Sequence, residues 1–186
     1  RKCSDILTIF PVISRSKCEA ANMNEGAMQE RIVLCRTLDE IQALLERFHM
    51  VLPSLKRGKA FRAAMAEKFF QHGKVVFIPE DGRAVGFAAF YCNDHVERKG
   101  YLSMIAVYPD MQGKGCGKEL LTYVEHTAKD CGMRTVWLEV SKANGSARSF
   151  YRKNGYVPVE MRPESMICAK KLENASDEWT EDTHDV

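Results

Sequence analysis

The spacing of hydrophobic residues predicts a strand and then a helix where the patterned part of the chain begins. Residues 31–36 alternate as a strand does, and Thr37 with Glu40 three residues later forms a capping-box pattern that predicts a helix start. Pro53 ends that helix. Its apolar residues at helical spacing, which we expect to be buried, are Ile41, Leu44, Leu45 and Phe48.

A second helix is predicted over residues 56–71. Gly73 lies just past its end, where a glycine in the left-handed conformation commonly closes a helix. A helix that packs on a sheet needs one apolar face. The residues expected on that face are Phe61, Ala64, Met65, Lys68 and Phe69.

From residue 75 onward, predicted strands and helices are interspersed. The dipeptide Asp81-Gly82 is a strong hairpin signal. An element order of this kind predicts an α/β (α+β) fold, with helices on both faces of one sheet. The strands are predicted over 75–79, 84–92, 99–108, 134–140, 156–161 and 165–172, and the helices over 118–130 and from Asn144 or Ser146 to Gly155.

The composition is that of a globular chain. The 186 residues are 45% hydrophobic and 28% charged, with a net charge of +2 and no run of eighteen apolar residues. We therefore expect no nucleic-acid partner and no membrane association. Seven scattered cysteines, an odd number without a C-x-x-C pair, argue against a disulfide framework and against a metal site. Reduced thiols fit a cytoplasmic protein.

The hydrophobic pattern divides the chain into three segments. One domain is expected over residues 29–173, where the periodic pattern lies. Residues 1–28 are expected to form an extra N-terminal segment that is extended or disordered. Residues 174–186 form an acidic tail that is also expected to be disordered.

A glycine-rich stretch between the predicted strand 99–108 and the predicted helix 118–130 is the strongest candidate for chemistry. Glycine allows a positive φ and a close approach of ligand to main chain, and the first turn of a helix offers unpaired N–H groups at its positive end. The stretch therefore predicts a phosphate site. Its residues are Gln112, Gly113, Lys114, Gly115, Cys116, Gly117 and Lys118.

Two familiar nucleotide motifs do not fit this stretch. A P-loop would need glycine at Gln112 and serine or threonine at Glu119. A dinucleotide fingerprint would need a third glycine at Lys118 or Leu120.

The stretch 102–159 resembles the GCN5-related N-acetyltransferases, the GNAT family, in the order and spacing of two motifs. The first is Q/R-x-x-G-x-G/A at residues 112–117. The second combines Asn144, Ala147 and the block 150–156 in the helix after the next strand. The resemblance implies that family's fold, a central mixed, mostly antiparallel sheet of about six to seven strands flanked by about four helices.

The resemblance also implies acetyl-CoA as the co-substrate. Loop N–H groups would hold the pyrophosphate, the strand edge would pair with the pantetheine arm, and Asn144 would hydrogen-bond that arm or cap its helix. Lys114 and Lys118 would add charge, or are ordinary surface lysines. The implied coenzyme contacts are Ile105, Ala106, Val107, Gln112, Gly113, Lys114, Gly115, Cys116, Gly117, Lys118, Asn144, Ala147 and Tyr151.

Two residues are candidates for proton transfer. The resemblance places Tyr151 near the sulfur as the general acid, and the alternative is a tyrosine that only packs. Glu139 lies in an otherwise apolar strand, so it is either a general base or one half of an ion pair. Ribosomal-protein alanine acetyltransferases of the family carry a glutamate in a segment similar to 137–140, W-L-E-V.

The predicted acceptor is a primary amine of a small molecule, such as an amino sugar, an amino acid or a polyamine. The final turn, 162–165, is short, whereas the ribosomal-protein enzymes carry a longer, aromatic-rich segment there. A protein N-terminus or lysine stays open as the acceptor, and so does a role as an acyl-CoA-binding regulator without catalysis. Dimers are common in such folds, so a homodimer is compatible with this sequence, although no interface is evident in it.

Overall fold

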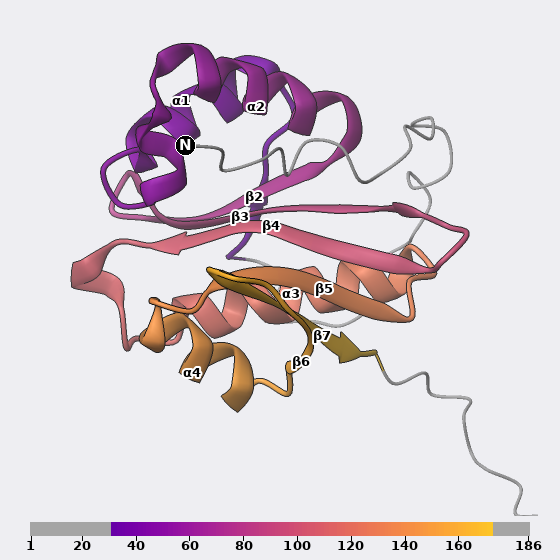
Figure 1. Cartoon of the computed structure of the whole chain (residues 1–186). Helices are drawn as coiled ribbons and strands as arrows, with labels where there is room; N and C mark the ends of the chain where they lie inside the picture. Colours follow the sequence, from indigo (N-terminus) through magenta and orange to yellow (C-terminus); the bar gives the residue numbers. More distant parts are fainter. Residues whose placement is uncertain (1–30, 173–186) are drawn as a thin grey trace, which may run out of the picture.

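A computed structural model describes residues 31–172, which form one seven-stranded sheet with helices on both faces (Figure 1). The strands are β1 (Val33–Leu34), β2 (Lys74–Glu80), β3 (Arg83–Asp94), β4 (Lys99–Val107), β5 (Thr135–Ser141), β6 (Val157–Met161) and β7 (Ser165–Lys171). Their order in the sheet is β1-β2-β3-β4-β5-β7-β6. Only β4 and β5 are parallel neighbours among these strands, so the expected mixed, mostly antiparallel sheet is confirmed.

Four α-helices and two short 3₁₀ helices connect these strands within residues 31–172. They are α1 (Leu38–Phe48), η1 (Pro53–Arg57), α2 (Lys59–His72), η2 (Pro109–Met111), α3 (Cys116–Asp130) and α4 (Gly145–Lys153). Figure 1 shows α1 and α2 on one face of the sheet and α3 and α4 on the other. None of the helices in this part of the chain is long and apolar enough to cross a membrane.

Each face of the sheet has its own hydrophobic core. Successive residues of a strand point to opposite faces. Accordingly, Val76 and Ala88 pack in the core that contains α3, whereas Val75 and Ala89 pack in the core that contains α1 and α2. The buried residues predicted for the first helix are confirmed.

Two local predictions are confirmed in detail. The capping box of α1 is present, since Thr37 Oγ1 accepts from the Glu40 N–H and the Glu40 carboxylate accepts from the Thr37 N–H. The hairpin turn between β2 and β3 has positive φ at both Asp81 and Gly82, as an Asp-Gly turn requires.

The second predicted helix is confirmed in its end before Gly73 and in the burial of Met65 and Phe69, but its start, the place of Ala64 on its buried face and the conformation of Gly73 were wrong. The chain forms η1 and then α2, because Gly58 between them has a φ of 106°, outside the range of a helix. Ala66 is buried and Ala64 is exposed. Gly73 is extended rather than left-handed, with a φ of −119°. A glycine is needed at this position because the β3 main chain packs closely against it, and a Cβ there would lie 3.0 Å from the Phe90 carbonyl oxygen.

The first strand is shorter than predicted. Its ladder with β2 joins only Val33 to Phe77 and Leu34 to Val76. As one of the two edge strands of the described sheet, β1 has one neighbour there, and both of its residues are exposed. The segments predicted over 1–28 and 174–186 lie outside the described residues.

Candidate active site

The strands β4 and β5 pair over a short distance and then separate. Their parallel ladder starts at Lys99 and Thr135 and ends at Leu102 and Leu138. At that point β4 contains a bulge at Ser103, because Leu102 pairs with Phe90 of β3 while Met104 pairs with the adjacent Ala89. A bulge bends its strand and increases the local twist, which accounts for the end of the ladder.

The bulge also exchanges the two faces of β4. Leu102 packs in the α3 core, whereas Met104 and Ala106 pack in the α1–α2 core, so even-numbered residues change sides. Ile105 and Val107 pack toward α3. Over residues 103–107 the edge of β4 toward β5 has no ladder partner within the described sheet. An extended ligand can bind main-chain groups on such an edge as another strand would.

The glycine-rich stretch leads from β4 into the N-terminus of α3, as predicted. Gly113 and Gly115 have φ of 78° and 92°, and Gly115 is the left-handed N-cap of α3. A Cβ on either glycine would meet nothing within 4 Å, so the loop is open on that side. The Glu119 N–H donates to the Gly115 carbonyl at 3.0 Å, so the N–H groups of 116–118 precede the helical ladder. Three such N–H groups at the positive helix end suit an anion.

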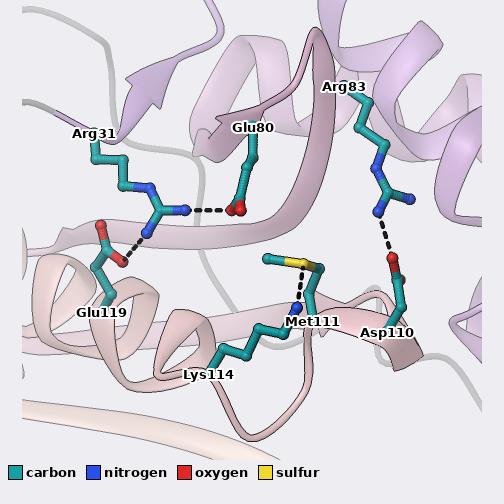
Figure 2. Close-up of polar contacts among 7 residues, drawn as sticks. All are labelled: Arg31, Glu80, Arg83, Asp110, Met111, Lys114 and Glu119. Atoms are coloured by element: carbon teal, nitrogen blue, oxygen red, sulfur yellow. Dashed lines mark hydrogen bonds and ion pairs between the residues drawn. The ribbon is translucent and has the colours of Figure 1, made fainter.

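The side chains of this loop are mostly engaged with the protein. Gln112 Nε2 donates to the Val107 carbonyl at 3.1 Å and thereby ties the loop to β4. Lys114 folds back, with its Nζ 3.5 Å from Met111 Sδ (Figure 2). Cys116 begins α3, two residues earlier than predicted, and the residue is 1% exposed, so its thiol packs in the α3 core and is not available to a ligand. Lys118 is exposed.

The predicted acid Tyr151 lies on α4 and is largely buried. Its residue is 8% exposed, and its ring is 5.4 Å from that of Phe150 and 5.7 Å from that of Tyr156. Burial raises the pKa of Tyr151, with further contributions from Cys168 and Tyr101. The hydroxyl is therefore protonated at neutral pH, and it is a weaker acid than a free phenol.

The start of α4 is capped by Asn144. Its Oδ1 accepts from the Ala147 N–H at 3.1 Å and from Ser146 Oγ at 3.0 Å. The N-cap interpretation of Asn144 is confirmed, and the Ala147 N–H is taken up by the cap. Contacts of these residues with a coenzyme stay predictions.

The carboxylate of Glu139 is held by two residues of the β6–β7 hairpin. Ser165 Oγ donates to Oε1, and Arg162 Nη1 donates to Oε2 at 3.3 Å. Arg162 also binds Glu160 through Nε at 2.8 Å. The Glu139 side chain is 17% exposed, so it is partly accessible. The ion-pair alternative for Glu139 is therefore present in the structure, while its role as a base is untested.

Sequence reasoning missed several residues around Glu139. Ser165 and Arg162 reach it from a hairpin that is distant in sequence, and Tyr101 lies across from Trp137 in the β4–β5 ladder. Burial and the Glu139 carboxylate raise the pKa of Tyr101 to about 12. Tyr101 also contributes to the raised pKa of Tyr151, so it lies near both candidates. No sequence signal identifies these neighbours, because they depend on strand register.

Together the loop, the β4 edge and the polar cluster suit one extended, phosphate-bearing ligand. The loop offers N–H groups for a phosphate, the β4 edge offers main-chain groups for an extended arm, and Glu139 and Tyr151 follow on β5 and α4. Within residues 31–172, no three His, Cys, Asp or Glu side chains lie together as a metal site. The loop and the β4 edge suit the diphosphate and the extended arm of acetyl-CoA.

Comparison with known proteins agrees with the fold. The family model described as "Acetyltransferase (GNAT) family" matches residues 38–156. A solved structure, PaiA N-acetyltransferase from Thermoplasma acidophilum in complex with coenzyme A, is similar with a TM-score of 0.60 and 19% identity. The match covers 75% of this chain and 98% of that one. At that identity, the similarity concerns the fold.

Curated relatives differ in the acceptors their names state. The [ribosomal protein bS18]-alanine N-acetyltransferase of Haemophilus influenzae is 39% identical over 83 residues, which is 45% of this chain and 54% of the relative. An amino-acid acetyltransferase of Aeromonas salmonicida is 23% identical over 150 residues, 81% of this chain and 31% of the relative. The chain thus spans about half the length of the first relative and about a third of the second.

The loop geometry predicts that Gly115→Ala weakens acetyl-CoA binding by about tenfold. An alanine in the left-handed conformation costs roughly 1–2 kcal/mol, so the first turn of α3 would rotate and misalign its N–H groups. Isothermal titration calorimetry with acetyl-CoA measures the change in Kd.

Gly132→Ala is the matched control. Gly132 lies just past the other end of α3, with a φ of 79° and nothing within 4 Å of a Cβ. The Gly132→Ala variant should lose stability as Gly115→Ala does, while its Kd for acetyl-CoA stays at the wild-type value. Equal Kd values for wild type and both variants would show that the loop does not hold the coenzyme.

Proposed function

The chain belongs to the GNAT acetyltransferase family, and from that premise we propose that it transfers the acetyl group of acetyl-CoA to the primary amine of a small molecule. The observation that carries the proposal is the pairing of two features, the open glycine loop at the start of α3 and the β4 edge that β5 leaves unpaired. The loop suits the pyrophosphate of a coenzyme, and the neighbouring strand edge suits the pantetheine arm of the same molecule.

The residues of the loop and of β4 would bind and orient the coenzyme. Main-chain N–H groups of 113–118 would bind the pyrophosphate, with Lys118 adding charge. Main-chain groups of Ile105, Ala106 and Val107 would pair with the pantetheine arm, and an N–H of this strand would polarise the carbonyl that the amine attacks. When bound, acetyl-CoA supplies a thioester whose thiolate is the leaving group.

The two candidate catalytic side chains, Tyr151 and Glu139, lie on opposite faces of the sheet. Tyr151 belongs to the core on the α3–α4 face, as do Leu138 and Val140 of β5. Glu139 alternates with those two residues, so its side chain lies on the other face. With the carbonyl held where β4 and β5 separate, the amine would approach on the Glu139 face and the sulfur would lie toward Tyr151.

Direct attack requires that the amine lose a proton and the thiolate be stabilised. We assign the first task to Glu139, oriented by Ser165 and Arg162, directly or through a water. We assign the second to the Tyr151 hydroxyl. Because the pKa of Tyr151 is raised, its main contribution would be a hydrogen bond to the developing thiolate, with proton transfer completing product release.

A small acceptor is favoured by the shape of the β6–β7 hairpin. The Arg162 N–H donates to the Ser165 carbonyl at 3.0 Å, so the turn is tight and carries no long segment that would contact a peptide. The second candidate is a protein N-terminus, which the name of the Haemophilus influenzae relative and its 39% identity favour. A regulator that binds acyl-CoA without turnover is the third.

The expected cytoplasmic location and homodimer also stay proposals. The thiols of Cys35, Cys116 and Cys168 are free and buried, which agrees with a reducing compartment. The reaction as proposed needs no metal ion.

An acceptor panel tests the proposal directly. Purified protein is incubated with acetyl-CoA and with amino sugars, amino acids, polyamines and peptides with free N-termini, and the released thiol is measured. We expect turnover with small amines and none with peptides. Turnover confined to peptides would support the second candidate, and coenzyme binding without turnover on any acceptor would support the regulator.

Tyr151→Phe should lower kcat by about ten- to ten-thousand-fold, the range typical of general acid catalysis, and leave the Kd of acetyl-CoA almost unchanged. Tyr156→Phe is the matched control, because this tyrosine is also buried, its ring is 5.7 Å from that of Tyr151, and its hydroxyl interacts with Glu125 of α3. A wild-type kcat in Tyr151→Phe would leave Tyr151 with a packing role only.

Glu139→Gln should lower kcat at neutral pH by about a hundredfold or more and make the rate rise with pH, because the amine must then lose its proton to solvent. The pH profile of kcat/KM measures this change. Ser165→Ala should act in the same direction but more weakly, since Arg162 still orients the carboxylate. An unchanged profile in Glu139→Gln would reduce Glu139 to an ion-pair partner of Arg162.

A further inference from the structure

We propose that the tip of the β2–β3 hairpin, together with Arg31, is a brace that fixes both ends of the glycine loop and so sets the affinity for the diphosphate of the acyl donor. The inference rests on the proposed function of the loop. It assigns positioning roles to Arg83, Asp110, Arg31 and Glu119, none of which belongs to the motifs of the loop itself. Figure 2 shows these residues on the two sides of Lys114 and Met111.

The first contact of the brace holds the entrance of the loop. Arg83 is the first residue of β3, and its guanidinium binds the carboxylate of Asp110 in η2, two residues before Gln112. The same guanidinium lies over the ring of Tyr108, 5.6 Å from its centroid. The Arg83 contact keeps the pKa of Asp110 below its usual value, so the pair is charged at neutral pH.

The second contact holds the exit of the loop. Glu119 lies in the first turn of α3, and its carboxylate is 3.8 Å from Nη1 of Arg31. The other terminal nitrogen of Arg31 binds Glu80, the last residue of β2. Arg31 therefore joins the first turn of α3 to the hairpin.

Both contacts converge on one rigid element. Glu80 and Arg83 are opposite each other in the β2–β3 ladder, on the two sides of the Asp81-Gly82 turn. Between the two fixed ends, the loop contains Gly113 and Gly115, whose backbones have the widest conformational choice. Fixing the ends of a glycine-rich segment reduces the entropy that it loses when it closes on a ligand.

The exposure of the Arg83–Asp110 pair argues against a role in overall stability. The side chains of Arg83 and Asp110 are 45% and 57% exposed, and exposed ion pairs contribute little to folding. Their position beside a site for a dianion is what distinguishes them.

A double-mutant cycle separates bracing from simple charge. We expect Arg83→Gln and Asp110→Asn each to raise the Kd of acetyl-CoA by about two- to fivefold, the range of an exposed ion pair. The Kd of the double variant should not exceed that of the single variant with the higher Kd, because both changes break the same contact. If the charges acted only through space, Asp110→Asn would tighten binding while Arg83→Gln weakened it, and that outcome would overturn the brace.

A truncated donor provides the readout that a general structural defect would not give. Acetyl-pantetheine lacks the diphosphate, so kcat/KM with this donor should equal the wild-type value in all three variants, while KM for acetyl-CoA rises. The same loss with both donors would mean a distorted site and would contradict the proposal. So would an unchanged Kd for acetyl-CoA in both single variants.

The pair Arg62–Glu46, which joins α1 to α2 with Nε 2.7 Å from the carboxylate, is the matched control. Arg62→Gln should change the melting temperature without changing the Kd of acetyl-CoA. Wild-type protein that binds no acetyl-CoA would refute the proposed function itself. Wild-type protein that binds normally, with variants that bind equally well, would refute only the brace.

Discussion

The candidate site depends on one irregularity of the sheet, the extra residue at Ser103 of β4. The bulge turns over the faces of β4, so that Leu102 and Met104 enter different cores, and the ladder to β5 ends at the same place. In a regular sheet, the ladder would continue and the main-chain groups of residues 103–105 would bond to β5. Because the strands separate, those groups are available beside a loop that offers helix N–H groups for a phosphate.

The separation of β4 and β5 would also allow groups from opposite faces of the sheet to act in the one reaction that we propose. A continuous sheet would keep Tyr151, under the α3–α4 face, apart from Glu139 on the other face. Tyr101 lies one residue before the end of the β4–β5 ladder and interacts electrostatically with both Glu139 and Tyr151. The β6–β7 hairpin holds Glu139 through Ser165 and Arg162, so in the proposed reaction the C-terminal strands would form the acceptor side of the site.

Features determined by neighbouring residues were predictable from the sequence. The capping box at Thr37, the Asp-Gly turn and the glycine-led start of α3 all follow from local backbone preferences. The bulge was not predictable, because Leu102, Met104 and Ala106 are all buried and are spaced like one face of a regular strand. The partners of Glu139 and the close contact at Gly73 depend on register and tertiary packing, which no local pattern encodes.

Amide hydrogen exchange of the wild-type protein, followed residue by residue with and without coenzyme A, tests the central claim most directly. The account predicts that coenzyme A slows exchange in two stretches, the β4 edge over 103–107 and the first turn of α3 over 113–118, and leaves β1 and α1 unchanged. Slowed exchange elsewhere, with neither of these stretches affected, would contradict it.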